Sequence, residues 1–420
     1  MTTSDGMRLD TVSTATEEPL PPRPEEPPAA GRLSPGQWLR TNLFSTAVNG
    51  VLSMVVGSVL LLVLYRAARF MLFTGRWEIV RVNLRVFMVG RFPTDELARV
   101  WAAILVAALF AGIAAGAARR RSGHGDLRGG LRRAAPLLVA LTVVLSFTRT
   151  WVPAAMTVAS FAVAGLGHVL GRVAPPRVTR RVPLVALAGV LGAYVALTAF
   201  GGVGWARWGG LLLTLFLALG GIVISFPFGV LLALGRRSTF PAVRLVCVGY
   251  IELIRGVPLI TLIFMAFLMV GFFLPPGFAT PDLVTRVLIA LILFTAAYVA
   301  EVVRGGLQSV PRGQIEAAQA LGLSPLKQTF RIVLPQALRN VIPALVGQFI
   351  SLFKDTSLVA FVGALDLLNV AQVVTAQGAF LAQGLAAETL AFVSLIYWAF
   401  CYSMSRASQR LEKRLGVGDR

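Results

Sequence analysis

The chain has 420 residues, of which 56% are hydrophobic and only 14% are charged, and its net charge is +20. Soluble domains carry about a quarter charged residues, so this composition excludes an ordinary soluble protein and predicts an integral membrane protein. Several apolar runs approach the roughly 20 residues needed to cross a bilayer, and they lack the strict alternation of a barrel strand. The predicted fold class is therefore an all-α integral membrane protein.

The positive charge also argues against binding of nucleic acid. Almost all of it comes from arginines that bunch in short segments between apolar runs, which is typical of membrane orientation and not of a basic patch on a soluble domain. Cys247 and Cys401 lie far apart, and no metal or nucleophile cluster forms around His124 or His168, the only histidines. We therefore expect no disulfide framework, no metal site and no catalytic site.

In chain order, the proline- and glutamate-rich residues 1–40 predict a disordered tail. Ten predicted membrane spans follow, near 47–69, 98–118, 134–149, 151–171, 184–203, 209–235, 244–274, 284–305, 338–362 and 386–406. With ten spans, four arginine-rich segments fall on one side of the membrane, and the positive-inside rule makes that side the cytoplasm. Both termini are then cytoplasmic, and a second tail covers 409–420.

The segment 70–97 is an exception to this charge asymmetry. It is predicted to lie outside, yet it carries four arginines: Arg76, Arg81, Arg85 and Arg91. Its apolar residues are Trp77, Ile79, Val80, Leu84 and Phe87, a pattern that favours a helix lying on the membrane surface.

The cytoplasmic loop between the eighth and ninth spans, 309–337, is too patterned for a plain connector. Pro311 suits a first helical turn, and the helix formers that follow it stop at Gly322. Ser324 and Pro325 then predict a second short helix, which we expect to end at Pro335. The loop is thus predicted to be a helix, a glycine corner and another helix at the membrane surface.

Seven residues of this loop resemble the "EAA" motif of permease subunits in binding-protein-dependent ABC importers, and every specified spacing matches. They are Glu316, Ala317, Ala318, Gly322, Ile332, Leu334 and Pro335. In that family the loop forms a coupling helix that docks on a separate ATPase subunit. The small alanines would permit close approach, and glycine the sharp bend. The competing interpretation is an ordinary amphipathic helix at the interface.

The resemblance extends over the C-terminal half of the chain. The segment 250–258 reads YIELIRGVP, where polar amino-acid permeases have "YxExxRGTP", so Val257 replaces the usual threonine. The segment 354–358 matches their "KDTSL", whereas Gly347 replaces a usual asparagine. The additional N-terminal helices are similar to those of M-type permeases of general L-amino-acid importers. By this resemblance, 206–408 is a five-helix permease core and 41–205 holds extra transmembrane helices.

The resemblance also implies the partners. They are ABC ATPase subunits, a second related permease and an extracytoplasmic amino-acid-binding protein, with an amino acid as substrate and membrane lipid as surroundings. The chain has no Gly-x-x-x-x-Gly-Lys-Ser/Thr loop, so we expect ATP and Mg²⁺ to bind the ATPase and no cofactor to bind this chain. The predicted location is a bacterial inner membrane, crossed several times.

Charged residues within spans either pair or face a pathway, because burying a charge in lipid is costly. Glu301 and Arg304 are three residues apart on one helix face, which suits either an intrahelical pair or substrate binding by Glu301. Glu252 and Arg255 have the same spacing before Pro258, which predicts either a kink with a structural ion pair or an exposed substrate site.

The last polar run of the spans is Lys354, Asp355, Thr356 and Ser357. Adjacent charged residues point to different helix faces, so we expect these residues to hold neighbouring helices or a subunit interface together rather than to bind substrate.

The main functional alternative is an ion-coupled secondary transporter of small polar solutes. That class usually has two similar halves, which this sequence lacks, and a coupling loop would have no role in it. A membrane enzyme is the third possibility, and the absence of a nucleophile or metal cluster argues against it.

Overall fold

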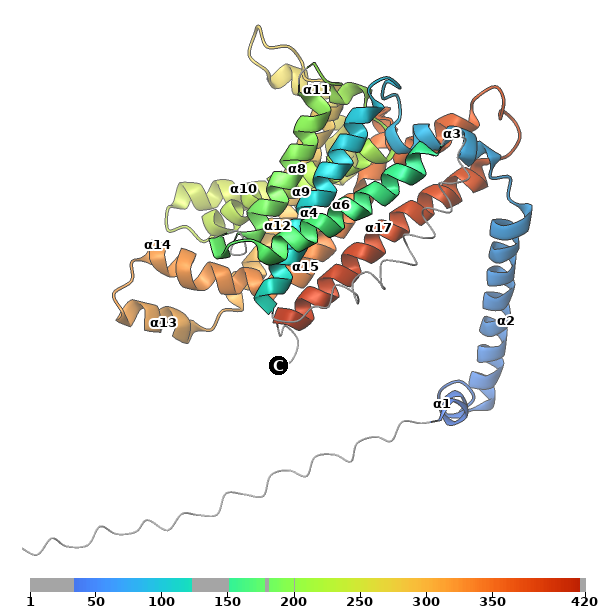
Figure 1. Cartoon of the computed structure of the whole chain (residues 1–420). Helices are drawn as coiled ribbons and strands as arrows, with labels where there is room; N and C mark the ends of the chain where they lie inside the picture. The colour runs from blue at the N-terminus through green and yellow to red at the C-terminus, as the bar shows by residue number, and fades with distance from the viewer. Residues whose placement is uncertain (1–33, 123–150, 178–180, 200, 416–420) are drawn as a thin grey trace, which may run out of the picture. The chain divides into compact units, whose positions relative to one another are not determined.

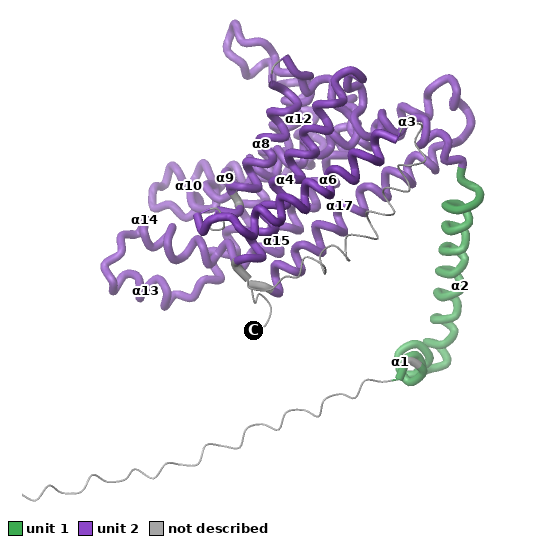
Figure 2. The backbone as a smooth tube through the Cα atoms, in the orientation of Figure 1, with its two compact units in different colours: residues 1–75 green, residues 76–420 purple. Residues whose placement is uncertain are grey.

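The computed structural model describes residues 34–122, 151–177, 181–199 and 201–415. In this part of the chain the secondary structure is helical, apart from an isolated bridge between Gly210 and Asp366 (Figure 1). The chain forms two compact units, Met1–Gly75 and Arg76–Arg420 (Figure 2). The boundary predicted near residue 205 falls inside the second unit and stays a prediction.

The first unit contains α1 (Pro35–Asn42), α2 (Ala47–Arg69) and a π-helical turn, η1 (Phe70–Thr74). The last residues of the predicted disordered tail are therefore helical, because Ser34 and Gln37 form a capping box ahead of Pro35. The rest of that tail, 1–33, lies outside the described residues. Nearly every apolar side chain of α2 is exposed, as expected for a helix surrounded by lipid.

The second unit holds the remaining helices (Figure 1). They are α3 (Glu78–Val89), α4 (Leu97–Ser122), α6 (Val152–Val173), α8 (Val182–Thr198), η2 (Trp205–Arg207), α9 (Gly210–Arg236), α10 (Pro241–Gly256), α11 (Leu259–Met269), η3 (Val270–Phe273), α12 (Leu283–Gln308), α13 (Arg312–Ala320), α14 (Pro325–Gln328), η4 (Thr329–Val333), α15 (Leu334–Asp355), η5 (Thr356–Val362), α16 (Leu367–Thr375) and α17 (Ala386–Leu415).

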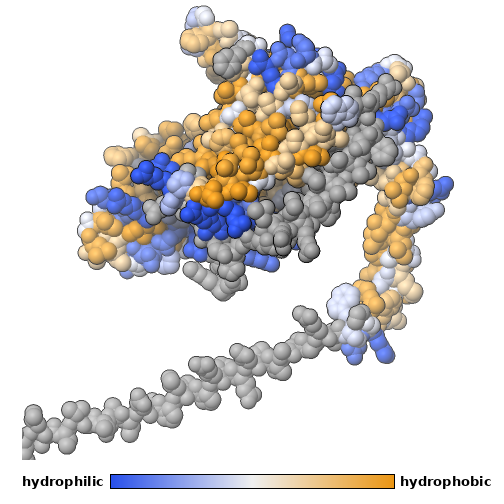
Figure 3. All heavy atoms as spheres, in the orientation of Figure 1, coloured by the Kyte–Doolittle hydropathy of each residue, from blue (hydrophilic) through white to orange (hydrophobic). Residues whose placement is uncertain are grey.

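Seven of the described helices are long and apolar enough to cross a membrane, or eight if one bent pair counts as a span. A shorter apolar helix, Leu184–Thr198, matches another predicted span, and the span predicted at 134–149 lies outside the described residues. Hydrophobic side chains cover much of the visible middle of the second unit, as lipid contact requires (Figure 3). The fold class is confirmed, whereas the total of ten spans stays a prediction.

The span predicted at 244–274 is broken at Pro258, where the sequence predicts a kink. Two helices, Pro241–Gly256 and Leu259–Phe273, meet there at 105°. Pro258 lies between them in extended backbone and is the N-cap residue of α11. The cause is local, because proline cannot donate the helical hydrogen bond and disfavours helical backbone in the residue before it. The result is an elbow between α10 and α11.

Very close packing joins α4 to α6. A Cβ atom on Gly112 would lie 2.2 Å from the carbonyl oxygen of Ala164, and one on Gly171 would lie 2.2 Å from that of Ile113. Only glycine allows backbones to approach so closely, and such small residues favour helix association in lipid. Gly167 and Gly171, four residues apart on α6, both lie in this helix contact.

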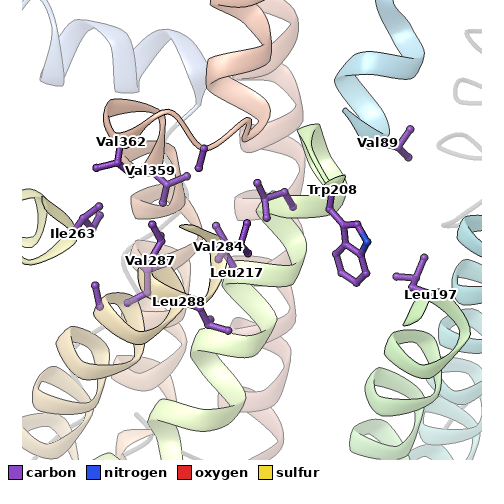
Figure 4. Packing of buried hydrophobic residues seen from close by; sticks show 14 of the residues in the cluster. Val89, Leu197, Trp208, Leu217, Ile263, Val284, Val287, Leu288, Val359 and Val362 are labelled. Carbon is purple, nitrogen blue, oxygen red and sulfur yellow. The ribbon is translucent and has the colours of Figure 1, made fainter. Parts of the chain in front are cut away.

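The main apolar core lies between α9, α11, α12 and η5. Figure 4 shows side chains such as Leu217, Ile263 and Val287 converging there, and Ile263 and Val287 are fully buried. An aromatic group then links α8 to α9, with the Tyr194 and Phe216 rings stacked and their centroids 6.1 Å apart. This core fixes the long helices whose ends carry the charged residues described next.

The segment 70–97 forms the predicted amphipathic helix, α3, but the helix buries its apolar face in protein. Ile79 and Phe87 are fully buried and pack in one cluster with Leu367, Val370 and other residues of α16 and α17. The expectation that this face rests on the membrane is therefore wrong. A sequence pattern shows that a face is apolar but not whether lipid or protein covers it.

Candidate coupling loop and charged cluster

The loop after α12 is two helices joined by a sharp corner, as predicted. The first, α13, ends at Ala320, and the second begins at Pro325 after Ser324 in the N-cap position. In Figure 1 both extend from one end of the bundle. The loop is anchored by Val310, Val333 and Leu334, which belong to a buried cluster with residues of α9 and α12.

Gly322 makes the corner. Its φ is +68°, and a Cβ atom placed there would meet nothing within 4 Å. The glycine is thus required by the backbone and not by lack of space. The N–H of Gly322 donates to the carbonyl of Gln319 at 2.8 Å, and that of Leu323 to Ala318 at 3.1 Å, so the helix end is closed by its own backbone.

The seven motif residues divide into two sets. Ala318 and Leu334 are buried and Ile332 is half-buried, whereas Glu316, Ala317, Gly322 and Pro335 are exposed. Three large apolar side chains join the exposed set: Leu321 is 79% exposed, Leu326 71% and Phe330 50%. A bare apolar surface around a carboxylate is typical of a surface that another protein covers.

Pro335 does not end the second helix. Helical backbone continues from Pro325 to Val362, passing through the π turn η4. There the N–H of Leu334 donates to the carbonyl of Thr329, one residue further back than in an α-helix. Pro335 follows at the start of α15, where its missing N–H is tolerated. The loop is therefore continuous with a membrane helix.

A charged cluster gathers where α9, α10 and α12 end. Glu301 of α12 is its centre, with a side chain only 15% exposed. Arg304 donates from Nη2 to Glu301 Oε2 at 2.9 Å, which is the intrahelical contact that the sequence allowed as one of two interpretations. Arg236 of α9 donates to Glu301 Oε1 at 2.8 Å, and Arg255 of α10 lies 3.4 Å from Oε2. The Glu301 carboxylate thus forms ion pairs with arginines of three helices, α9, α10 and its own α12.

Glu252 and Arg255 do not pair with each other. Glu252 accepts from Arg236 at 3.0 Å, and the Arg255 guanidinium lies 5.6 Å from the ring centroid of Tyr298, a cation–π distance. The two side chains are also more exposed than Glu301, at 56% and 35%. The predicted separate pairs are therefore parts of one network beside the Pro258 elbow.

The chemistry of this network is electrostatic. Three guanidinium groups and two carboxylates leave one net positive charge where helices end. Glu301 already forms ion pairs with three arginines, so it can meet a substrate ammonium only after the network opens. Glu252 and Arg255 are accessible without such a change, and they offer one negative and one positive group.

The polar run on α15 is placed differently. Thr356 is fully buried, and its hydroxyl donates to the carbonyl of Phe353 at 2.7 Å, where the α-helix tightens into η5. Lys354 is exposed, Asp355 is half-buried, and neither makes an ion pair within the described residues. A role for Lys354, Asp355, Thr356 and Ser357 in holding subunits together stays a prediction.

In the part of the chain that the structure describes, no group of three His, Cys, Asp or Glu side chains could hold a metal ion. That this chain binds no cofactor stays a prediction.

The sequence did not predict Arg236 as a site residue, because its arginine-rich segment was used only to assign the orientation in the membrane. A signal was present, since Arg236 lies at the end of a predicted span and the next two spans each carry a glutamate. The sequence also did not predict Leu326 and Phe330, whose exposure the motif does not specify.

A family model, described as the binding-protein-dependent transport system inner membrane component, matches residues 225–417. The glutamate/glutamine/aspartate/asparagine transport system permease protein BztC of Rhodobacter capsulatus is 37% identical, over 97% of this chain and 99% of that protein. The chain belongs to this family. The match to BztC covers nearly the whole chain, so the likeness includes helices that precede the family model.

The chain also matches one further relative and one solved structure. The inner membrane amino-acid ABC transporter permease protein YhdY of Escherichia coli is 52% identical over 50% of this chain, and the match spans 57% of YhdY. A solved structure titled as a crystal structure of an amino acid ABC transporter with histidines shares 30% identity, with a TM-score of 0.43, and covers 48% of this chain and 90% of its own.

Proposed function

We propose that this family member is the transmembrane subunit of an ATP-driven amino-acid importer. The printed names of two relatives, an amino-acid ABC transporter permease and a glutamate/glutamine/aspartate/asparagine permease, support this substrate class. These relatives do not support the alternative of an ion-coupled secondary transporter. The observation that carries the proposal is the helix–corner–helix loop, with its exposed carboxylate and apolar side chains and its direct continuation into α15.

In this proposal the loop residues Glu316, Ala317, Leu321, Leu326 and Phe330 form the surface that an ATPase subunit covers. ATP and Mg²⁺ belong to that partner. Movement of the ATPase pushes the loop as a rigid body, and the continuous helix from Pro325 to Val362 carries the push into the membrane. The loop side of the membrane is the cytoplasm, and a binding protein delivers substrate on the other side.

The substrate pathway is proposed to pass the charged cluster at the α10–α11 elbow. An amino acid carries an ammonium and a carboxylate, and Glu252 and Arg255 present the complementary charges with partial exposure. The Arg236–Glu301–Arg304 contacts would then hold the cytoplasmic end of the pathway together. Lys354, which is exposed on α15, is proposed to contact the second related permease.

The test is co-purification of the ATPase with variants of the loop. Leu326→Glu places a charge on the exposed apolar surface, so the variant should insert normally but retain little ATPase. Arg244→Glu is the matched control, because Arg244 is exposed on α10 and is not part of the loop. Equal ATPase recovery with wild type and Leu326→Glu would contradict the proposed docking surface.

A further inference from the structure

The proposed function gives no role to the arginines of 76–91, which oppose the charge asymmetry of the rest of the chain. Arg76 belongs to the fold, since its backbone N–H donates to Glu388 at 3.0 Å and its side chain reaches Gln383. Arg81, Arg85 and Arg91 differ. All three are exposed, and their side chains make no ion pair or hydrogen bond with any described residue.

The apolar face of α3 is covered by protein and so cannot insert into lipid. A membrane-surface helix inserts its apolar face between lipid chains. In α3 that face is taken up by protein, because Ile79 and Phe87 are fully buried against α16 and α17. Arg81 and Arg85 are four residues apart and therefore share a face, and that face is exposed. The arginines are thus presented on a protein support.

This support lies at the end of the bundle opposite the coupling loop. Gly90, just after α3, approaches Gly209 so closely that a Cβ atom on it would lie 2.3 Å from the Gly209 Cα. Gly209 is the N-cap residue of α9, and α9 has 27 residues, about 40 Å of helix. At the other end of α9, Arg236 joins the cluster around Glu301 beside the loop.

The support is also packed directly against the transmembrane helices of the second unit. Gln377, just beyond α16, donates to Asn83 of α3 at 3.0 Å, and Phe87 packs edge-on against Phe392 of α17 with ring centroids 5.1 Å apart. A partner that binds α3 therefore contacts an element packed on α9, α16 and α17. No long flexible linker separates the exposed arginines from the transmembrane helices.

We propose that Arg81, Arg85 and Arg91 form a docking surface for an acidic surface of the extracytoplasmic binding protein. Unpaired guanidinium groups attract carboxylates and bind them with two hydrogen bonds, and such charge pairs speed and orient protein association. Glu78 is the one acidic residue of α3, so the helix surface remains net positive. The proposal rests on the importer function, and it names the site at which that importer receives its loaded binding protein.

The experiment uses the complete transporter in nanodiscs of phosphatidylcholine, which has no net charge. The transporter's own binding protein, loaded with its amino acid, is titrated while ATP hydrolysis is measured. The variant R81Q/R85Q/R91Q should raise the half-maximal concentration about tenfold, which equals about 1.4 kcal/mol, and leave the maximal rate unchanged. R81K/R85K/R91K keeps the charge but not the paired hydrogen bonds, so it should weaken binding less than the glutamine variant does. R244Q, which removes an exposed charge on α10 and leaves α3 intact, should also match wild type.

Added salt should raise the half-maximal concentration of binding protein for wild type. The wild-type value should therefore approach that of the glutamine variant. An unchanged half-maximal concentration for the glutamine variant would overturn the proposal. If wild type and the glutamine variant differed only in nanodiscs that contain anionic phosphatidylglycerol, the proposal would be overturned. The arginines would then bind lipid headgroups instead of the binding protein. A lysine variant as weak as the glutamine variant would also overturn it, since the positive charge would then not be what attracts the binding protein. If loaded binding protein fails to stimulate even wild type, the importer function itself fails, which is a distinguishable result.

Discussion

Arg236 at the end of α9 donates to Glu301 of α12 across 2.8 Å, although 65 positions separate them in the chain. The same guanidinium nitrogen lies 3.0 Å from Glu252 of α10. These two contacts join three helices beside the elbow at Pro258. Charged pairs that are shielded from water act strongly over such distances, so the network ties the helix ends together in this conformation.

The first prediction concerns this network. Glu301→Gln leaves three arginines without their shared carboxylate, so we expect a loss of about 1–3 kcal/mol in stability and slow uptake. Glu252→Gln is the matched control, because Glu252 is 56% exposed and has one arginine partner, and its stability should stay near wild type. Thermal unfolding of the purified complex measures the difference. Equal melting temperatures for the two variants would contradict a central role for Glu301.

The second prediction concerns the corner of the loop. Gly322→Val places a β-branched residue at φ +68°, which costs on the order of 1–3 kcal/mol locally. Membrane abundance should be normal, whereas ATPase co-purification and uptake should be lost. Gly313→Ala is the control, since Gly313 lies within α13 and a Cβ there meets nothing within 4 Å. Wild-type uptake by Gly322→Val would refute the requirement for this corner.

The third prediction tests the packing of α4 on α6. Gly112→Ala would force a Cβ to 2.2 Å from a backbone oxygen, so the helices must separate, at a cost of about 1–3 kcal/mol. Gly165→Ala adds the same methyl group on α6 where nothing lies within 4 Å, and it should be neutral. Thermal unfolding again provides the measurement. Two variants of the same stability would show that the close approach does not exist.

The fourth prediction is a pH dependence. Asp366 is fully buried and caps α16, and burial raises its pKa from 3.8 to about 7. The folded state therefore binds this proton more tightly than the unfolded state. The associated stability, up to about 4 kcal/mol, is present below pH 4 and is lost as the pH rises toward 7.

Asp366→Asn keeps a capping oxygen but removes the titration. Melting temperatures measured from pH 5 to pH 8 should fall more steeply for wild type than for this variant. Parallel curves for the two proteins would mean that Asp366 is not the group responsible.

The fifth prediction concerns orientation. In a background in which Cys247 and Cys401 are replaced by serine, single cysteines at Gly313 and Ala376 should react with an impermeant thiol reagent from opposite sides. Gly313 lies in the coupling loop and Ala376 follows α16, and both positions are exposed. The cytoplasmic side should label Gly313. Labelling of both cysteines from one side would contradict the proposed topology.

Much of the fold could be predicted because each membrane helix is a long apolar run that is visible in the sequence. Gly322 was predicted correctly because a helix stop followed at once by an N-cap and proline permits few backbone conformations. The effects of Pro258 and Pro335 on their helices were harder to predict. Both are prolines, but the helices on either side of Pro258 meet at 105°, whereas the helix that contains Pro335 is continuous after a π turn. Which outcome occurs depends on the preceding backbone and on packing.

Only some contacts of the charged cluster could be predicted from the sequence. The spacing of Glu301 and Arg304 predicts a contact within one helix, and this contact is present. Arg236 and Arg255 reach the same carboxylate from other helices, and local spacing holds no information about such contacts. Likewise, the burial of Ile79 and Phe87 beneath α16 depends on tertiary packing, so a surface position was the natural interpretation of their pattern.

The most direct test of the account is uptake of a labelled amino acid into proteoliposomes. The complete complex, with ATP at the ATPase and loaded binding protein on the other side, should accumulate substrate without an ion gradient. Gly322→Val, with its binding protein still recruited, should abolish this uptake. Accumulation by the purified single chain, driven by an ion gradient and without an ATPase, would contradict the assignment as a coupled importer subunit.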